Sequence, residues 1–106
     1  MAVLYITEFS SSTMAGLTNT STPSYPIPAP MTPPVAEQHV AIGAMSAPSA
    51  AFNAATNFVM IETDAICSLA FGASPVAVTT AHRMAANEVR FYGVVPGQAV
   101  AVIANT

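Results

Sequence analysis

The stretch Asn57-Phe-Val-Met-Ile-Glu-Thr-Asp-Ala-Ile-Cys-Ser-Leu-Ala-Phe71 decides the fold of this chain. Residues 57–63 and 65–71 are two short runs rich in β-branched and other apolar side chains, which is the composition of β-strands. Asp64 separates the runs and predicts a tight turn or a bulge between them. Apolar residues of the second run occupy both alternating faces, so we expect that strand to be partly buried on both sides.

Short strands and turns continue on both sides of this stretch. We predict strands at residues 2–9, 35–42, 76–80, 88–95 and 98–104, with turns at residues 72–75 and at Pro96-Gly97. Strands spaced by roughly 8–12 residues are typical of a β-sandwich or barrel. The predicted fold class is therefore mainly β, a single small β-sandwich or barrel. Residues 44–56 are rich in Ala, Ser and Asn and fit either a loop or a short helix over residues 46–57.

A Ser/Thr/Pro-rich segment separates the first predicted strand from the rest. Six of the nine prolines lie between Pro23 and Pro34, and proline favours extended backbone and lacks a ladder donor. We therefore divide the chain into an N-terminal strand with an extended Pro-rich N-terminal arm, residues 1–34, and a β core, residues 35–106. Removal of residues 1–34 is expected to leave a folded core that no longer assembles.

Apolar side chains within this N-terminal part are the candidate contact residues. In the arm they alternate with prolines and would anchor it along a neighbouring protein, whereas a purely flexible linker has little use for them. The predicted interface consists of Leu4 and Tyr5 of the first strand with Tyr25, Ile27 and Met31 of the arm.

The composition is poor in charge. Only 7% of residues are charged and 53% are hydrophobic, whereas about a quarter of a typical soluble domain is charged. No stretch reaches the roughly 20 apolar residues of a membrane-spanning helix, so we expect no membrane partner. A surface covered by neighbouring subunits explains the composition, and we predict a homo-oligomer. The net charge of −3 and the absence of lysine argue against nucleic acid, whose binding depends on cations.

The only candidate nucleophile is Cys67, with His82 and Asp64 as conceivable partners. A catalytic thiol must be exposed beside a base, but Cys67 lies in an apolar run, where cysteine is usually a core residue. We therefore predict no catalytic residue and no enzyme. As the single cysteine, Cys67 also excludes an internal disulfide.

Metal ligands are equally sparse. Glu62 and Asp64 share a strand face and could bind a cation or act as an acid/base pair. Two carboxylates beside a turn are more often simply solvated, and no third ligand is evident. His39 and His82 are too isolated for zinc, which needs three or four ligands. We predict no metal and no cofactor.

The two arginines, Arg83 and Arg90, stand among acidic residues. A structural salt bridge with Glu88 or Glu62 is the expected role of such an arginine, and a contact with a protein partner is the alternative.

Several blocks of this chain carry a family resemblance. They are residues 51–72, Arg83-Met-Ala-Ala-Asn87, Phe91-Tyr-Gly-Val94, Val100-Ala-Val-Ile-Ala-Asn105 and the opening Leu4-Tyr-Ile-Thr-Glu-Phe9. Together they resemble small virion structural proteins of tailed bacteriophages, encoded among capsid and tail genes. The arm lies outside the resemblance.

The resemblance implies a virion structural protein, in particular a capsid decoration (cement) protein. Its partners would be the major capsid protein or other virion proteins, and its location the virion, after synthesis in the host cytoplasm; the N-terminus lacks the basic region of a secretory signal. A head-to-tail connector or tail ring component is the main alternative. A receptor- or glycan-binding β-module is disfavoured, because Tyr5, Tyr25 and Tyr92 are widely spread and tryptophan is absent.

Overall fold

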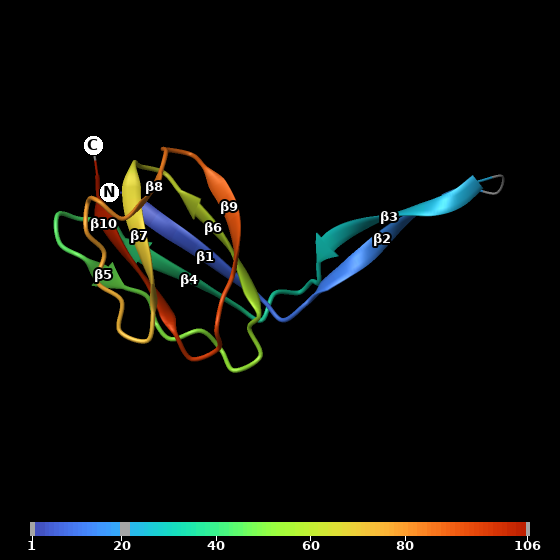
Figure 1. The fold of residues 1–106 in the computed structure, drawn as a ribbon, viewed down its shortest axis with the longest axis horizontal. Helices are drawn as coiled ribbons and strands as arrows, with labels where there is room; N and C mark the ends of the chain where they lie inside the picture. Colours follow the sequence, from blue (N-terminus) through green and yellow to red (C-terminus); the bar gives the residue numbers. More distant parts are fainter. Residues whose placement is uncertain (1, 20–21, 106) are drawn as a thin grey trace.

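The fold consists of two facing antiparallel sheets and a separate β-hairpin (Figure 1). The computed structural model describes residues 2–19 and 22–105, with side chains outside residues 12–28. Every element in this part of the chain is a strand: β1 (Val3–Phe9), β2 (Ser12–Asn19), β3 (Thr22–Pro30), β4 (Ala36–Ala41), β5 (Ala47–Pro48), β6 (Phe58–Thr63), β7 (Cys67–Gly72), β8 (His82–Met84), β9 (Val89–Gly93) and β10 (Ala99–Ala104). The mainly β fold class is confirmed.

Sheet 1 has the strand order β4-β1-β6-β9 and sheet 2 the order β5-β10-β7-β8. The two strands of the deciding stretch, β6 and β7, thus belong to different sheets. The bend at Asp64 carries the chain from one layer to the other, and the Asp64 Oδ1 accepts a hydrogen bond from the Val3 amide at 2.8 Å. The break expected at Asp64 is present, but it is a bend between the two sheets and not a tight turn or a bulge.

The core lies between the sheets, which makes the fold a sandwich. Alternate residues of each strand point inward, and apolar side chains occupy these positions. The buried contributors are Leu4, Ile6, Val40, Val59 and Ile61 from sheet 1 and Cys67, Leu69, Met84, Val100 and Val102 from sheet 2.

Strand β10 is buried on both faces from Ala99 to Val102. Residues 75–80 lie against the outer face of sheet 2 and cover it. The side-chain Nδ2 of Asn105 donates both to Thr79 O (2.9 Å) and to Ser68 Oγ on β7 (2.7 Å), which fixes this covering segment. The strand predicted over residues 76–80 is therefore wrong, because the segment packs on a sheet face and forms no ladder; the strand comes later, as β8.

The helix considered for residues 46–57 is also wrong. Pro48 forms part of the short strand β5, and Asn53 Oδ1 accepts a hydrogen bond from the Ala55 amide at 3.0 Å. Such local side-chain bonds compete with helix formation, and the segment is a loop that leads into β6.

The arm is a long insertion between two adjacent strands. β1 pairs with both β4 and β6, and the Val35 amide bonds to the Glu8 carbonyl at 2.7 Å where the chain re-enters sheet 1. The hairpin β2–β3 projects from the end opposite to where β1 begins and β10 ends (Figure 1).

This insertion corrects the division at residue 34. β1 is an inner strand of sheet 1, so the N-terminal strand belongs to the sandwich and only residues 10–34 form the arm. Removal of residues 1–34 would take out β1 together with its core residues Leu4 and Ile6. The prediction that residues 35–106 fold on their own is therefore not compatible with this topology.

Candidate interaction surface

The predicted contact residues do not form one patch. Leu4 is 0% exposed and points into the core, so its assignment to the interface is corrected: the inward side of β1 offers nothing to a partner. Its neighbour Tyr5 faces outward and is 39% exposed, and Met31, at the base of the hairpin, is 42% exposed. Tyr25 and Ile27 belong to β3, and their side chains lie outside the described part of the structure.

The outer face of sheet 1 has an apolar half formed by β6, β9 and Phe9 at the end of β1. Phe9 stacks on Phe58 with ring centroids 5.1 Å apart, and Phe58 lies 6.3 Å from Phe91. Met60 of β6 pairs with Phe91 of β9, and Val89 lies two residues before Phe91 on the same face of β9. Phe91 is 54% exposed and Val89 48% exposed. We call these five residues the apolar half-face.

The other half of this face is polar. Tyr5, Glu37, His39 and Glu62 line a hollow of about 210 Å³, and the Tyr5 and His39 rings meet edge to face at 5.0 Å. Although Glu37, His39 and Glu62 line the same hollow, no three His, Cys, Asp or Glu side chains among the described residues are placed to hold one metal ion. Glu62 and Asp64 do not act as a pair, since Asp64 has left the strand and holds the Val3 amide.

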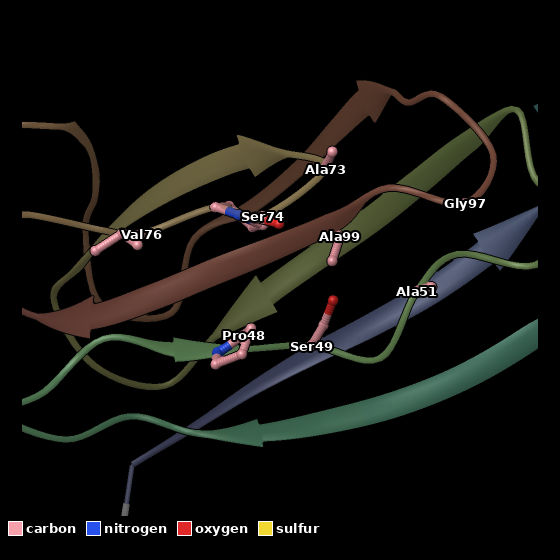
Figure 2. A pocket seen from close by; sticks show the side chains of 9 residues that line it. Pro48, Ser49, Ala51, Ala73, Ser74, Val76, Gly97 and Ala99 are labelled. Atoms are coloured by element: carbon pink, nitrogen blue, oxygen red, sulfur yellow. The ribbon is translucent and has the colours of Figure 1, made fainter.

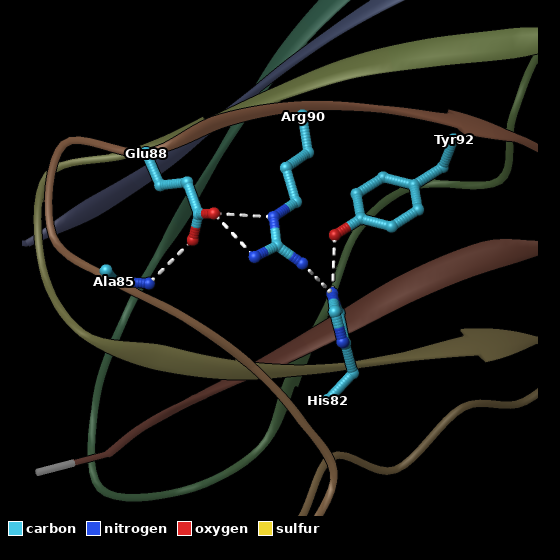
Figure 3. Close-up of polar contacts among 5 residues, drawn as sticks. All are labelled: His82, Ala85, Glu88, Arg90 and Tyr92. Atoms are coloured by element: carbon cyan, nitrogen blue, oxygen red, sulfur yellow. Dashed lines mark hydrogen bonds and ion pairs between the residues drawn. The ribbon is translucent and has the colours of Figure 1, made fainter.

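The outward position of Phe91 could not be deduced from alternation alone. The two faces of β9 carry Val89 and Phe91 on one side and Arg90 and Tyr92 on the other, and the structure turns the arginine side inward. Arg90 is held there by Glu88, two residues before it, and by His82 of β8, which is the edge strand of sheet 2 (Figure 3).

These partners form a polar chain. Arg90 pairs with Glu88 at 2.6 Å, and the other Glu88 oxygen accepts from the Ala85 amide at 2.8 Å. Arg90 Nη1 lies 3.2 Å and the Tyr92 hydroxyl 2.6 Å from His82 Nε2. Arginine has only donors, so His82 Nε2 accepts. The salt bridge expected for Arg90 is confirmed, with Glu88 two residues away as its partner.

The pKa shifts in this polar chain follow from its bonds. The Ala85 amide, and then Arg90, lower the pKa of Glu88, because both stabilise its carboxylate. The hydrogen bond to Glu88 raises the pKa of Arg90. Burial raises the pKa of Tyr92, against an opposing effect of Arg90. The groups hold each other in place, and the structure gives them a role in sealing the sandwich edge.

Cys67 is a core residue, as predicted. It is fully buried, burial raises the pKa of its thiol, and its Sγ contacts Thr63 Oγ1 at 3.6 Å. A thiol with a raised pKa is a poor nucleophile at neutral pH.

One carboxylate inside the sandwich was missed by the sequence analysis. Glu8 is 2% exposed and accepts hydrogen bonds from the Asn53 amide (2.8 Å), Thr56 Oγ1 (2.7 Å) and Gln38 Nε2 (3.1 Å). It ties the loop before β6 to sheet 1 beside the root of the arm. The signal was its position: Glu8 stands in phase with the core residues Leu4 and Ile6.

A second hollow, of about 440 Å³, lies on the sheet 2 side (Figure 2). Small side chains line it: Pro48, Ser49, Ala51, Ala73, Ser74, Pro75, Val76, Gly97 and Ala99. None of these carries a charge or a group that titrates, so the hollow offers no acid, base or metal ligand.

No protein-family model, curated protein or solved structure matches this chain. Among the described residues, no helix is long and apolar enough to cross a membrane. The functional argument therefore depends on the surface of the molecule itself.

Proposed function

We propose that this chain is a non-enzymatic virion structural protein, and specifically a capsid decoration protein that stabilises a phage head through protein–protein contacts. The observation that carries the proposal is the apolar half-face, where Val89 and Phe91 are about half exposed in front of the Phe9–Phe58 stack. Large apolar side chains that are exposed side by side on a protein surface mark a site of interaction with another surface.

Two further features support an assembly role. The chain has few charges, so much of its surface can be desolvated at low cost, and the arm extends the reach of the molecule beyond the sandwich. A shell repeats each contact many times by symmetry, so an individually weak contact is sufficient.

The copy number in purified phage particles tests the assignment. Quantitative mass spectrometry would compare this protein with the major capsid protein of the same particles. Copies in proportion to the shell lattice are expected for decoration. A single ring's worth would instead support the head-to-tail connector or tail component, and absence from the particles would refute a virion role.

The apolar half-face can be tested separately. Phe91→Thr should weaken binding of the purified protein to particles assembled without it, because it removes an exposed aromatic ring and keeps a residue suited to a strand. Val78→Thr is the matched control, since Val78 is also about half exposed (51%) but lies in the segment over sheet 2. Equal co-sedimentation of the two variants would contradict this placement of the interface.

A further inference from the structure

The hairpin β2–β3 has two different free edges. Ser12 pairs with Pro30, Met14 with Pro28 and Gly16 with Pro26. The Met31 amide donates to the Ser11 carbonyl at 3.0 Å, which identifies the odd-numbered residues of β2 as the hydrogen-bonded pairs of the ladder. The three proline pairs are therefore the alternate pairs, whose backbone groups point away from the partner strand.

This phase blocks one edge and leaves the other open. On the outer edge of β3, each of the three successive outward positions is a proline nitrogen without a proton, so a further strand would find no donor there. On the outer edge of β2, Ser12, Met14 and Gly16 each present an amide and a carbonyl. Neither strand of the hairpin pairs with any strand described in the sandwich.

The open edge lacks the usual protection. Natural edge strands are commonly guarded by charged residues, above all lysine, or by proline, but residues 10–34 contain no Asp, Glu, Lys, Arg or His. A two-stranded hairpin alone is only marginally stable in water. The absence of charge also means that two copies of the arm do not repel each other.

We propose that β2 pairs antiparallel with β2 of a second copy of this chain, giving a four-stranded sheet in the order β3-β2-β2-β3. A two-fold axis at Met14 places Met14 opposite its own copy and Ser12 opposite Gly16, so all three outward positions of the regular ladder are used. The prolines of β3 then close both outer edges, and growth stops at the dimer. This inference is independent of the proposed function, since it needs no virion.

The mass of the full-length protein in solution is the first test, measured by sedimentation velocity over a range of concentrations. The wild type is expected at twice the 10.8 kDa chain mass. Met14→Pro removes an outward amide proton and no bond within the hairpin, and it should abolish the dimer. The double variant Pro26→Ala, Pro28→Ala restores donors on β3 and should produce species larger than the dimer.

Cross-linking keeps the test decisive if Met14→Pro disturbs the hairpin. Directly opposite residues of a hydrogen-bonded antiparallel pair have Cα atoms about 5.5 Å apart, which suits a disulfide. Met14→Cys should give a covalent dimer under mild oxidation, and Ala29→Cys, on the blocked strand, should not. A monomeric wild type, a dimer that persists in Met14→Pro without perturbed folding, or equal cross-linking of the two cysteine variants would overturn the proposal.

Discussion

Replacing Glu8 by alanine removes the acceptor for three hydrogen bonds in the interior of the sandwich. Each donor left without a partner in a buried site costs about 1–3 kcal/mol. Thr56 is fully buried and bears the whole cost, whereas the Asn53 amide and Gln38 lie closer to solvent. We expect Glu8→Ala to lower the free energy of unfolding by about 3 kcal/mol, from about 1–3 kcal/mol for the buried Thr56 hydroxyl and smaller costs for the two donors nearer to solvent.

The variant Glu8→Gln keeps the shape of the side chain and replaces one of its two carboxyl oxygens by an NH₂ group. Gln38 cannot turn its amide to compensate, because Ala50 holds both ends: the Ala50 amide donates to Oε1 at 2.9 Å and the Ala50 carbonyl accepts from Nε2 at 3.3 Å. An NH₂ group at position 8 would therefore face the NH₂ of Gln38. The hydrogen bond from Gln38 is lost, while those from Asn53 and Thr56 remain possible. We therefore expect Glu8→Gln to lower the free energy of unfolding by about 1–2 kcal/mol.

Urea unfolding followed by circular dichroism measures these differences at neutral pH. The control is Glu37→Ala, which replaces an exposed acidic residue of the neighbouring strand β4. Its free energy of unfolding should lie within about 0.5 kcal/mol of the wild-type value. In a thermal scan, Glu8→Ala should lower Tm by roughly 12–24 °C, from about 4–8 °C per kcal/mol for a domain of this size. If Glu8→Ala costs no more than Glu37→Ala, Glu8 does not hold the loop to the sheet.

Three further predictions concern the arm, the thiol and the sandwich edge. Replacing residues 12–30 by an Asn-Gly turn should leave the sandwich folded with an unchanged urea midpoint, because Ser11 and Met31 are already joined by a hydrogen bond; loss of cooperative unfolding would show that the hairpin is needed for the fold. Cys67 should react with an aromatic disulfide reagent only in urea, since it is fully buried with a raised pKa; rapid labelling of the native protein would contradict this. The folded-state pKa of Glu88 lies below its ordinary value of 4.5, so its stabilising contribution is present above that pH and is lost as the pH falls through the lowered pKa. Glu88→Gln should therefore be less stable than the wild type at pH 7 in urea melts, with the difference shrinking in acid, and a pH-independent difference would exclude this linkage.

The strands with plain alternation were predictable from the sequence. The expected segments at residues 2–9, 35–42, 57–63, 65–71, 88–95 and 98–104 all contain strands of the structure, with boundaries within a few residues. Each combines β-branched or aromatic residues with adjacent turn signals, so local preference and burial agree.

The hairpin was not predicted, although its signal is in the sequence. Proline removes a donor, which favoured an extended arm, but Pro26, Pro28 and Pro30 are spaced by two. That spacing leaves every second amide of β3 able to bond to β2. The period of the prolines thus matters more than their number.

The apolar half-face depended on a choice that local sequence does not determine. Either face of β9 could have turned inward, and the arginine side did so because Glu88, His82 and Tyr92 satisfy its polar groups. His82 lies only eight residues before Arg90 but belongs to β8 of the other sheet. How the two sheets meet therefore decides which face of β9 turns inward, and alternation only states that two faces exist.

The position of the hairpin has a consequence for folding. β1 and β4 are neighbours in sheet 1, yet residues 10–35 separate them, and the entropy cost of closing a loop rises by about 0.6 kcal/mol for each doubling of its length. Compared with a tight turn of about four residues, this connection costs roughly 1.6 kcal/mol more. Pairing of β2 with β3 brings Ser11 beside Met31 and shortens the effective loop to a few residues. A partner that clamps the hairpin therefore also stabilises the sandwich at a distance, by restricting the chain that joins its first two paired strands.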